Sequence, residues 1–301
     1  MASQPNSLDQ ERKSQTNRGA WLVELPSVEI LEMRGLDGLD LLQRISTNDL
    51  TKMEVGSWAQ TVLTNAKGRM IDLLWVGRIQ KDLLYLASGA KNPHKSKEWI
   101  EKFIIMEDVH IFPSMEMYKH LVLVGEIDLP GDGLYMQFEE QRSRTRFRHV
   151  LVKGSAFQML LDVTYKLGIQ RRSADEFEDY RISEGVPIVG HEITDEFNPL
   201  EAGLERLISW TKGCYVGQEV IARLDTYKKV QRRLVRLALS GGVVSLPVRI
   251  VGSAGEVGTL TSITNRSPFI GLGYVAVGQV KAKEAMFVEM GGEQIQVELK
   301  D

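Results

Sequence analysis

The segment Lys-Gly-Cys-Tyr-Val-Gly-Gln-Glu, residues 212–219, decides how the rest of this chain is interpreted. It contains Cys214, the only cysteine of the protein, between Gly213 and Gly217. Two closely spaced glycines favour a tight turn or a close backbone approach. An ammonium group such as that of Lys212 favours the thiolate of a nearby cysteine, the nucleophilic and metal-binding form. From residue types alone, Cys214 is equally well interpreted as a functional thiol or as a small buried apolar side chain.

The composition is that of an ordinary globular protein. A chain of 301 residues is long enough for two domains or three compact modules. Its hydrophobic fraction of 43% and charged fraction of 26% predict a packed core. The net charge of -3 gives no general attraction to nucleic acid, so no direct DNA binding is expected. One cysteine excludes an internal disulfide and a four-cysteine metal site within one chain, and no resident metal is expected.

The N-terminal region has no hydrophobic core of the kind that targeting signals carry. Residues 1–18 are polar, and Asp9 and Glu11 argue against a basic presequence. No apolar run in the chain approaches the ~20 residues that cross a bilayer, so no membrane association is expected. We therefore expect a disordered leader at 1–18 and a cytoplasmic protein.

Apolar–polar periodicity predicts a mixture of strands and short helices. Alternation from Ala20 to Met33 predicts two strands separated by a turn at Pro26. Between two further strands, Asn65-Ala66-Lys67-Gly68 is typical of a hairpin turn. The same patterns predict strands at 58–64, 70–79 and 83–87 and helices at 36–45, 92–105, 155–167 and 174–183.

Asp72 lies in the apolar strand that returns from this hairpin turn. Burying a carboxylate there costs free energy unless the group is paired or hydrogen-bonded, so a buried one is retained for structure or for function. Asp72 is therefore either an outward-facing or hydrogen-bonded structural group or a functional carboxylate.

A second candidate feature is a run of arginines with a period of two, which places them on one face of a strand. Such a face could hold phosphates or an anionic ligand tail, or could be a solvated sheet edge that resists unwanted strand pairing. The four residues are Arg142, Arg144, Arg146 and Arg148.

The connection at 184–204 is long and rich in turn residues, which indicates a functional segment. Its His191 has carboxylates nearby in the sequence but no second histidine at metal-binding spacing. Beyond residue 232, six short apolar runs alternate with glycine-rich breaks, which predicts a small barrel or sandwich. We therefore expect one domain at 19–230, with two subdomains as an alternative, and a second domain at 231–301.

The segment 212–219, followed by Arg223, resembles the signature of the YgfZ proteins. These are folate-binding relatives of the glycine-cleavage T-protein (aminomethyltransferase) and include mitochondrial iron–sulfur maturation factors. The T-protein itself lacks the cysteine signature, so the resemblance favours the maturation factors. Four other blocks resemble the family, at residues 34–49, 64–72, 181–201 and 257–268.

The resemblance implies an α+β, GcvT-like fold. It would consist of a T-protein-like folate-binding module of antiparallel sheets with helices, around a central channel that holds tetrahydrofolate, and a small C-terminal β-barrel. Two positions depart from the T-protein pattern. Leu73 replaces the second of two aspartates in the hairpin, and Ser183 replaces a pterin-contacting glutamate, with Glu184 next to it.

The resemblance also supplies the candidate site residues. Cys214 and Asp72 are the candidate catalytic residues, with Asp72 near the reactive nitrogens of the folate. Because one cysteine cannot hold a cluster alone, a partner chain, a second copy of this chain or a small thiol would complete the chemistry of Cys214. The residues expected to bind tetrahydrofolate, or a one-carbon derivative of it, are Asp72, Glu184, Lys212, Tyr215, Gln218, Glu219 and Arg223.

Three functions are compatible with these features. The leading hypothesis is an accessory protein, rather than an enzyme, that binds folate and assists the assembly, repair or activity of iron–sulfur enzymes, including those that methylthiolate tRNA. Its partners would be iron–sulfur proteins or assembly factors. The alternative is a folate-dependent aminomethyltransferase or methyltransferase, in which Cys214 is incidental. The third is an RNA-binding module, against which the net charge and the lack of interleaved aromatic residues count.

Overall fold

The computed structural model describes residues 19–300 except 90–92, 127–128, 130–134, 141–146, 244, 254 and 291. The expected leader at 1–18 lies outside the described residues, as do Arg142, Arg144 and Arg146 of the arginine run. The chain groups into two compact units. Unit 1 comprises residues 1–29 and 115–177, and unit 2 comprises residues 30–114 and 178–301.

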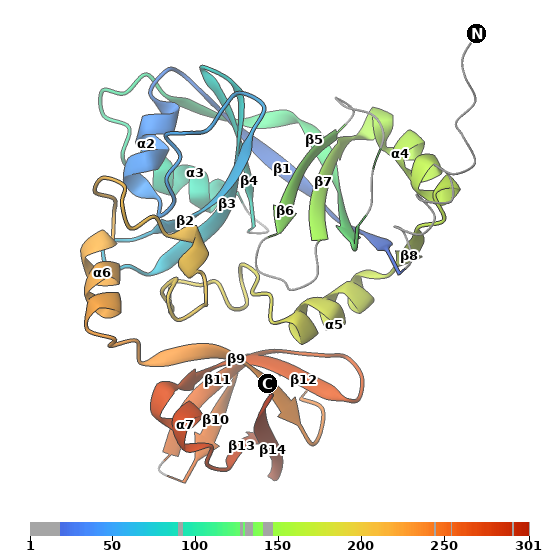
Figure 1. The fold of residues 1–301 in the computed structure, drawn as a ribbon, viewed down its shortest axis with the longest axis vertical. Coiled ribbons are helices and arrows are strands. Elements are labelled where there is room, and N and C mark those ends of the chain that lie inside the picture. The colour runs from blue at the N-terminus through green and yellow to red at the C-terminus, as the bar shows by residue number, and fades with distance from the viewer. Residues whose placement is uncertain are drawn as a thin grey trace. The chain divides into compact units, whose positions relative to one another are not determined.

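Unit 1 is a small antiparallel sheet covered by one helix (Figure 1). The central strand pairs antiparallel with a neighbour on each side, and β1 pairs parallel with β8 through residues 21–23. Leu121, Val150 and Val152 of the sheet pack against Leu160 of the helix. The elements are β1 (Trp21–Arg34) and β5 (His110–Val124), both shared with unit 2, β6 (Tyr135–Glu140), β7 (Phe147–Lys153, central), α4 (Gly154–Lys166) and β8 (Gln170–Arg172).

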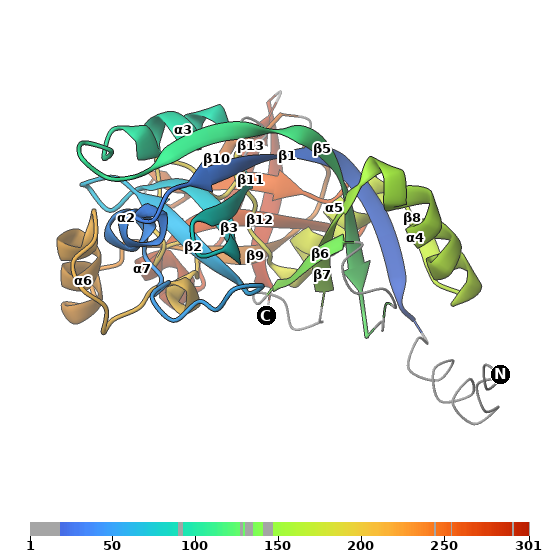
Figure 2. The same cartoon turned by 90° about the horizontal axis from the view of Figure 1, so that it is seen from above.

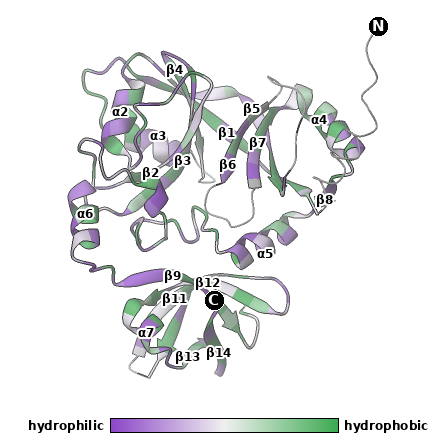
Figure 3. Cartoon of the chain, in the orientation of Figure 1, coloured by the Kyte–Doolittle hydropathy of each residue, from purple (hydrophilic) through white to green (hydrophobic). Residues whose placement is uncertain are grey.

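The first part of unit 2 is an antiparallel array in the order β2, β3, β4 and the second half of β1. Leu41, Leu42 and Ile45 of α2 are buried against this array, because residues three or four positions apart lie on one face of a helix. Figure 3 shows hydrophobic and hydrophilic residues on the same helix. The elements are α2 (Gly38–Ile45), β2 (Trp58–Thr64), β3 (Met70–Gln80), β4 (Leu83–Ser88) and α3 (His94–Glu101).

The second part of unit 2 ends in a closed barrel of six strands, which confirms the predicted β-barrel. Its strand order is β10-β11-β12-β9-β14-β13, around a core that includes Leu237, Ile250 and Leu260. The barrel strands lie within residues 232–300, while the independence of a domain at 231–301 stays a prediction. The elements are α5 (Ala174–Glu184), η1 (Glu205–Leu207), α6 (Gln218–Thr226), β9 (Arg232–Leu239), β10 (Val248–Gly252), β11 (Gly255–Ile263), β12 (Phe269–Ala276), α7 (Val277–Ala282), β13 (Met286–Met290) and β14 (Glu293–Lys300).

The predicted turn at Pro26 is wrong, because β1 continues through this residue as one strand. β1 pairs with β8 through residues 21–23 and with β4 through residues 30–34, so the exposed Pro26 falls between these two paired segments. A proline lacks the N–H that a ladder needs, and at this place it interrupts neither of these two ladders.

The helix predicted at 92–105 is shorter, because α3 ends at Glu101. Phe103 and Ile104 then donate their amides three residues back in tight turns and still pack against the core. The predicted start of α5 is confirmed by a reciprocal capping box. The Ser173 amide donates to Glu176 Oε2 at 2.9 Å, and the Glu176 amide donates to Ser173 Oγ at 3.2 Å.

Among the described residues, no helix is both long enough and apolar enough to cross a membrane.

Candidate functional site

The segment 212–219 ends in a tight contact with the β2–β3 hairpin. Gly217 has φ +86° and precedes the first residue of α6. A Cβ at Gly217 would lie 2.5 Å from the carbonyl oxygen of Asn65 and 3.0 Å from the Cα of Gly68, so only glycine fits. This contact places α6 against the hairpin turn, and Figures 1 and 2 show α6 next to β2 in both views.

Two hydrogen bonds hold the backbone of Val216 from opposite directions. Thr64 Oγ1, at the end of β2, donates to the Val216 carbonyl at 2.6 Å. The Val216 amide donates to the carbonyl of Arg44, near the end of α2, at 3.0 Å. Because both partners lie in regular elements, the position of the segment is fixed by the framework of unit 2.

Lys212 fastens the other end of the segment. Its Nζ donates to the carbonyl oxygens of Ser46 and Asn48, at 2.8 and 2.6 Å, and lies 5.2 Å from the centre of the Tyr215 ring. Burial lowers the pKa of Lys212 to about 8, while the charge of Asp49 acts in the opposite direction. Lys212 therefore anchors the segment to the loop after α2, and its effect on the thiol of Cys214 stays a prediction.

Cys214 is exposed, so its interpretation as a buried apolar side chain is wrong. Nothing lies within 4 Å of a Cβ added at Gly213, so the backbone before the thiol faces open space. By contrast, Tyr215 is buried, and this burial raises its pKa to about 12. The segment thus holds an accessible sulfur between residues that are fixed by their neighbours.

Asp72 is buried in β3, with a side chain 1% exposed, so the outward-facing alternative is wrong. Its Oδ2 accepts hydrogen bonds from the hydroxyls of Ser88, at 2.5 Å, and of Ser96. Its Oδ1 accepts the amide of Leu73 at 2.8 Å. The carboxylate therefore already has hydroxyl donors from β4 and α3, with which any ligand contact would compete.

Most of the predicted site residues are already neighbours in the sequence, in the segment 212–219 and the helix α6 that follows it. Gln218 is half-buried, and Glu219 and Arg223 are exposed one turn apart on α6. Through Gly217, this segment is docked on the hairpin whose second strand carries Asp72. Glu184, the last residue of α5, lies on a separate element. The contacts of these residues with folate stay predictions.

The block around Arg181 has a structural role that the sequence did not indicate. The Arg181 side chain is fully buried, and its guanidinium pairs with both carboxylate oxygens of Glu178 and, at 3.1 Å, with Glu192. It also donates to the Val186 carbonyl and, from Nη2, to Ser262 Oγ in the barrel at 2.9 Å. The guanidinium thus links α5, the following loop and β11.

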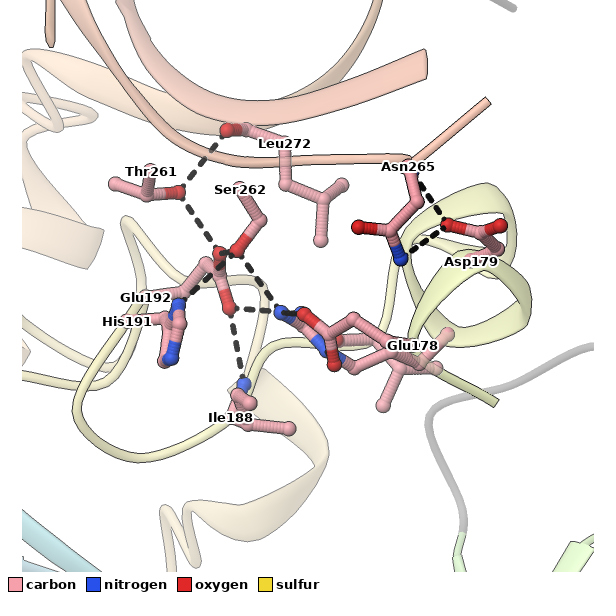
Figure 4. A network of polar contacts seen from close by, with 11 residues as sticks. Glu178, Asp179, Ile188, His191, Glu192, Thr261, Ser262, Asn265 and Leu272 are labelled. Carbon is pink, nitrogen blue, oxygen red and sulfur yellow. Dashed lines mark hydrogen bonds and ion pairs between the residues drawn. The ribbon is translucent and has the colours of Figure 1, made fainter. Parts of the chain in front are cut away.

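Glu192 completes this network, which Figure 4 shows from close by. Its side chain is fully buried and accepts hydrogen bonds from the hydroxyls of Thr261 and Ser262 and from the amide of Ile188. The Tyr274 hydroxyl donates to the Glu192 carbonyl at 2.7 Å. Together, the contacts of Arg181 and Glu192 fasten the barrel to the rest of unit 2, and we refer to them as the Arg181 network.

His191 lies beside this network, with Nδ1 3.5 Å from Ser262 Oγ. Within the part of the chain that the structure describes, no group of three or more metal-ligating side chains comes together. His191 therefore has a hydrogen-bonding partner from β11 rather than a set of companion ligands.

Sequence patterns missed the residues that position the candidate site. Ser88 and Ser96 bind Asp72, and Thr64 binds Val216 across 152 residues of sequence. A buried carboxylate requires hydrogen-bond donors, so the sequence predicts that Asp72 has donors if it is buried. Which residues supply them depends on tertiary contacts.

The comparisons with known proteins agree with this architecture. Residues 6–126 match the family described as GCVT N-terminal domain. The chain is 29% identical over 295 residues to "Putative transferase At1g60990, chloroplastic" from Arabidopsis thaliana, covering 89% of this chain and 68% of the relative. It is 25% identical over 314 residues to an aminomethyltransferase of Symbiobacterium thermophilum, covering 92% and 84%.

The chain is a distant homologue of aminomethyltransferases.

The crystal structure of the glycine cleavage system aminomethyltransferase T from Bartonella henselae has the same fold. It superposes with a TM-score of 0.76 at 17% sequence identity, covering 97% of this chain and 88% of that one. The predicted T-protein-like fold with a C-terminal barrel is thereby confirmed. The finer assignment to the YgfZ proteins stays a prediction.

Proposed function

We propose that the protein binds tetrahydrofolate, or a one-carbon derivative, and through Cys214 assists the assembly, repair or activity of iron–sulfur enzymes. These would include the enzymes that methylthiolate tRNA. Its partners are iron–sulfur proteins or their assembly factors, and it acts as an accessory protein in the manner of the YgfZ proteins that its signature resembles.

The observation that carries this proposal is the position of Cys214. The thiol is exposed, while Lys212, Tyr215 and Val216 on either side of it are buried or hydrogen-bonded to other elements. An exposed thiol on a fixed backbone can meet a second protein without rearrangement of the segment. Because the chain has no other cysteine, the remaining thiols or cluster ligands come from the partner.

Asp72 supports the folate part of the proposal. It lies in the hairpin whose sequence resembles the one that carries the catalytic aspartate of the T-protein. Its carboxylate accepts hydrogen bonds from two hydroxyls. In the proposed complex, the carboxylate accepts a hydrogen bond or a proton near the reactive nitrogens of the folate. Lys212, Tyr215, Gln218, Glu219, Arg223 and Glu184 are the proposed contacts for the rest of the cofactor.

The test is an anaerobic titration of tetrahydrofolate against the wild-type protein and the variants Asp72→Asn and Cys214→Ala. We expect Asp72→Asn to weaken binding at least about tenfold, and Cys214→Ala to leave it unchanged. Asp162→Asn, which changes an exposed carboxylate on α4, is the matched control for the loss of one charge. If the wild-type protein does not bind tetrahydrofolate, the cofactor assignment is wrong.

The role of Cys214 is tested separately in cells that lack the protein. We expect Cys214→Ala to restore folate binding capacity but not the activity of iron–sulfur enzymes, whereas Gly213→Ala restores both. Full restoration by Cys214→Ala would remove the thiol from the mechanism.

The second candidate is a folate-dependent aminomethyltransferase, favoured by the names of the relatives and by the place of Asp72. In this function Cys214 is incidental. Leu73, 1% exposed, occupies the place of the second T-protein aspartate, so Asp72 would act without it. Turnover of an aminomethyl donor with tetrahydrofolate that survives Cys214→Ala would favour the enzyme over the accessory protein.

A further inference from the structure

A cavity of about 320 Å³ lies at the C-terminal end of α6. The nine residues of α6 span ~13 Å, and Cys214 precedes the opposite end of this helix, so the cavity is separate from the site described above. Its walls come from α6, the connection to β9, α7 and the turn at 200–205. The volume is at the lower end of the range for small-molecule pockets, which is roughly 300–1,000 Å³.

The lining of this cavity combines an apolar wall with several charges. The apolar residues are Leu200, Leu224, Val230, Val277 and Val280. The charged residues are Glu205, Asp225, Lys228, Arg233 and Lys281. Such a lining suits a molecule with an apolar body and a charged head.

The sign of the unpaired charges decides which head group fits. Lys228 Nζ pairs with Asp225 Oδ1 at 3.0 Å. Arg233, Lys281 and Glu205 form no ion pair with any residue that the structure describes. Two unpaired cations against one unpaired carboxylate favour an anion over a cation.

The C-terminal turn of α6 places Lys228 at this cavity. Lys228 has φ +50° and occupies the left-handed position after α6, where its amide donates to Asp225 O and the Lys229 amide donates to Leu224 O. This hydrogen-bond pattern is a Schellman motif, in which glycine is preferred at the left-handed position. The motif ends α6 at the cavity, where the side chain of Lys228 is one of the charged groups of the lining.

We infer that this cavity binds a small carboxylate with an apolar body. The carboxylate lies among Lys228, Arg233 and Lys281, and the apolar body contacts the leucine and valine wall. The inference does not depend on folate binding, because it uses residues at the other end of α6 from Cys214.

The structure provides a matched control for Lys228. Lys283, at the C-terminal end of α7, has φ +53° and is the other described non-glycine residue with a positive φ, but it does not line the cavity. Glycine at either position relieves backbone strain and removes one positive charge, so neither variant is expected to unfold. The two variants therefore match in backbone change and charge, and Lys228→Gly differs by removing a lining cation together with its exposed pair to Asp225.

The test is a titration with hexanoate, followed by methyl NMR of protein labelled at leucine and valine. We expect saturable shifts of Val230, Val277 and Val280 with a Kd on the order of 1 mM, and binding of hexylamine at least about tenfold weaker. Lys228→Gly and Arg233→Gln should each weaken hexanoate binding about fivefold, whereas Lys283→Gly leaves it unchanged.

Three results would overturn the inference. One is the absence of saturable shifts at these methyl groups up to about 20 mM hexanoate. Another is equal binding of hexylamine and hexanoate, which would mean that apolar contact alone is responsible. The third is an equal effect of Lys228→Gly and Lys283→Gly.

Discussion

The segment 212–219 and the Arg181 network are both fixed by hydrogen bonds, yet they present different groups to the surroundings. In the Arg181 network, the fully buried side chains of Arg181 and Glu192 bind each other (Figure 4). In the segment, main-chain groups and the buried Lys212 make the contacts, and the thiol of Cys214 is left exposed. Substitutions in the network should therefore change the free energy of unfolding. Substitutions in the segment should mainly change the position of the Cys214 thiol.

The largest expected effect is on the Arg181 network. Arg181→Met removes the cation that pairs with the buried Glu192 carboxylate and should lower the free energy of unfolding by about 3–5 kcal/mol. Urea unfolding measures the change. Arg249→Met, at an exposed pair with Glu256, is the control and should cost less than about 1 kcal/mol. Similar small losses in both variants would contradict the structural role of Arg181.

Gly217→Ala is expected to have the largest effect within the segment. The added Cβ would lie 2.5 Å from Asn65 O at a residue with φ +86°, so α6 must shift from the hairpin, at a cost of about 1–3 kcal/mol. Hydrogen exchange should show faster exchange in α6 than in the barrel. Gly213→Ala, with open space around its Cβ, should stay within about 0.5 kcal/mol of wild type. Equal behaviour of the two alanine variants would disprove the tight contact.

Thr64→Val tests the hydrogen bond to Val216 O. The substitution removes a donor at 2.6 Å and leaves a carbonyl without this partner, which should cost about 1 kcal/mol in the free energy of unfolding. Thr226→Val, at an exposed position on α6, serves as the control in the same urea experiment. A neutral result for Thr64→Val would mean that the Arg44 carbonyl and Gly217 contacts hold the segment alone.

The smallest expected effect concerns Lys212 and alkaline pH. Its pKa is about 8 in the folded protein and ordinarily 10.5, so between these values the unfolded chain binds a proton that the folded chain does not. Unfolding free energy should therefore rise with pH in this window, by on the order of 1 kcal/mol relative to Lys212→Met. Unfolding at about pH 7.5, just below this window, and at about pH 9.5, within it, measures the difference. A constant difference between the two proteins would show that Lys212 is not desolvated.

Local patterns predicted much of the fold. The helix α2, the turn before Gly68 and the start of α5 each depend on residues close in sequence. Six short apolar runs likewise predicted the barrel strands. The uninterrupted β1 at Pro26 was not predicted, because tolerance of proline depends on which backbone groups have ladder partners.

The sequence predicted which residues belong to the candidate site, but not their positions relative to one another. Residue types and the family resemblance selected Asp72 and Cys214. Only the structure shows that Asp72 is buried and that Cys214 is exposed. The contact of Lys212 with Ser46 joins residues 166 positions apart, and that of Ser96 with Asp72 joins two elements. Such contacts depend on the packing of the whole unit, which periodicity does not encode.

The closure of the C-terminal barrel limits how this part of the chain can recognise another protein. In the part of the chain that the structure describes, each of the six strands pairs with two neighbours, so no strand lies at an outer edge of an open sheet. An extended peptide from a partner cannot be added to it as a further strand. Recognition by the barrel must use side chains or the connections between strands. A change of sequence there can alter which partner binds without disturbing the hydrogen bonds that close the barrel.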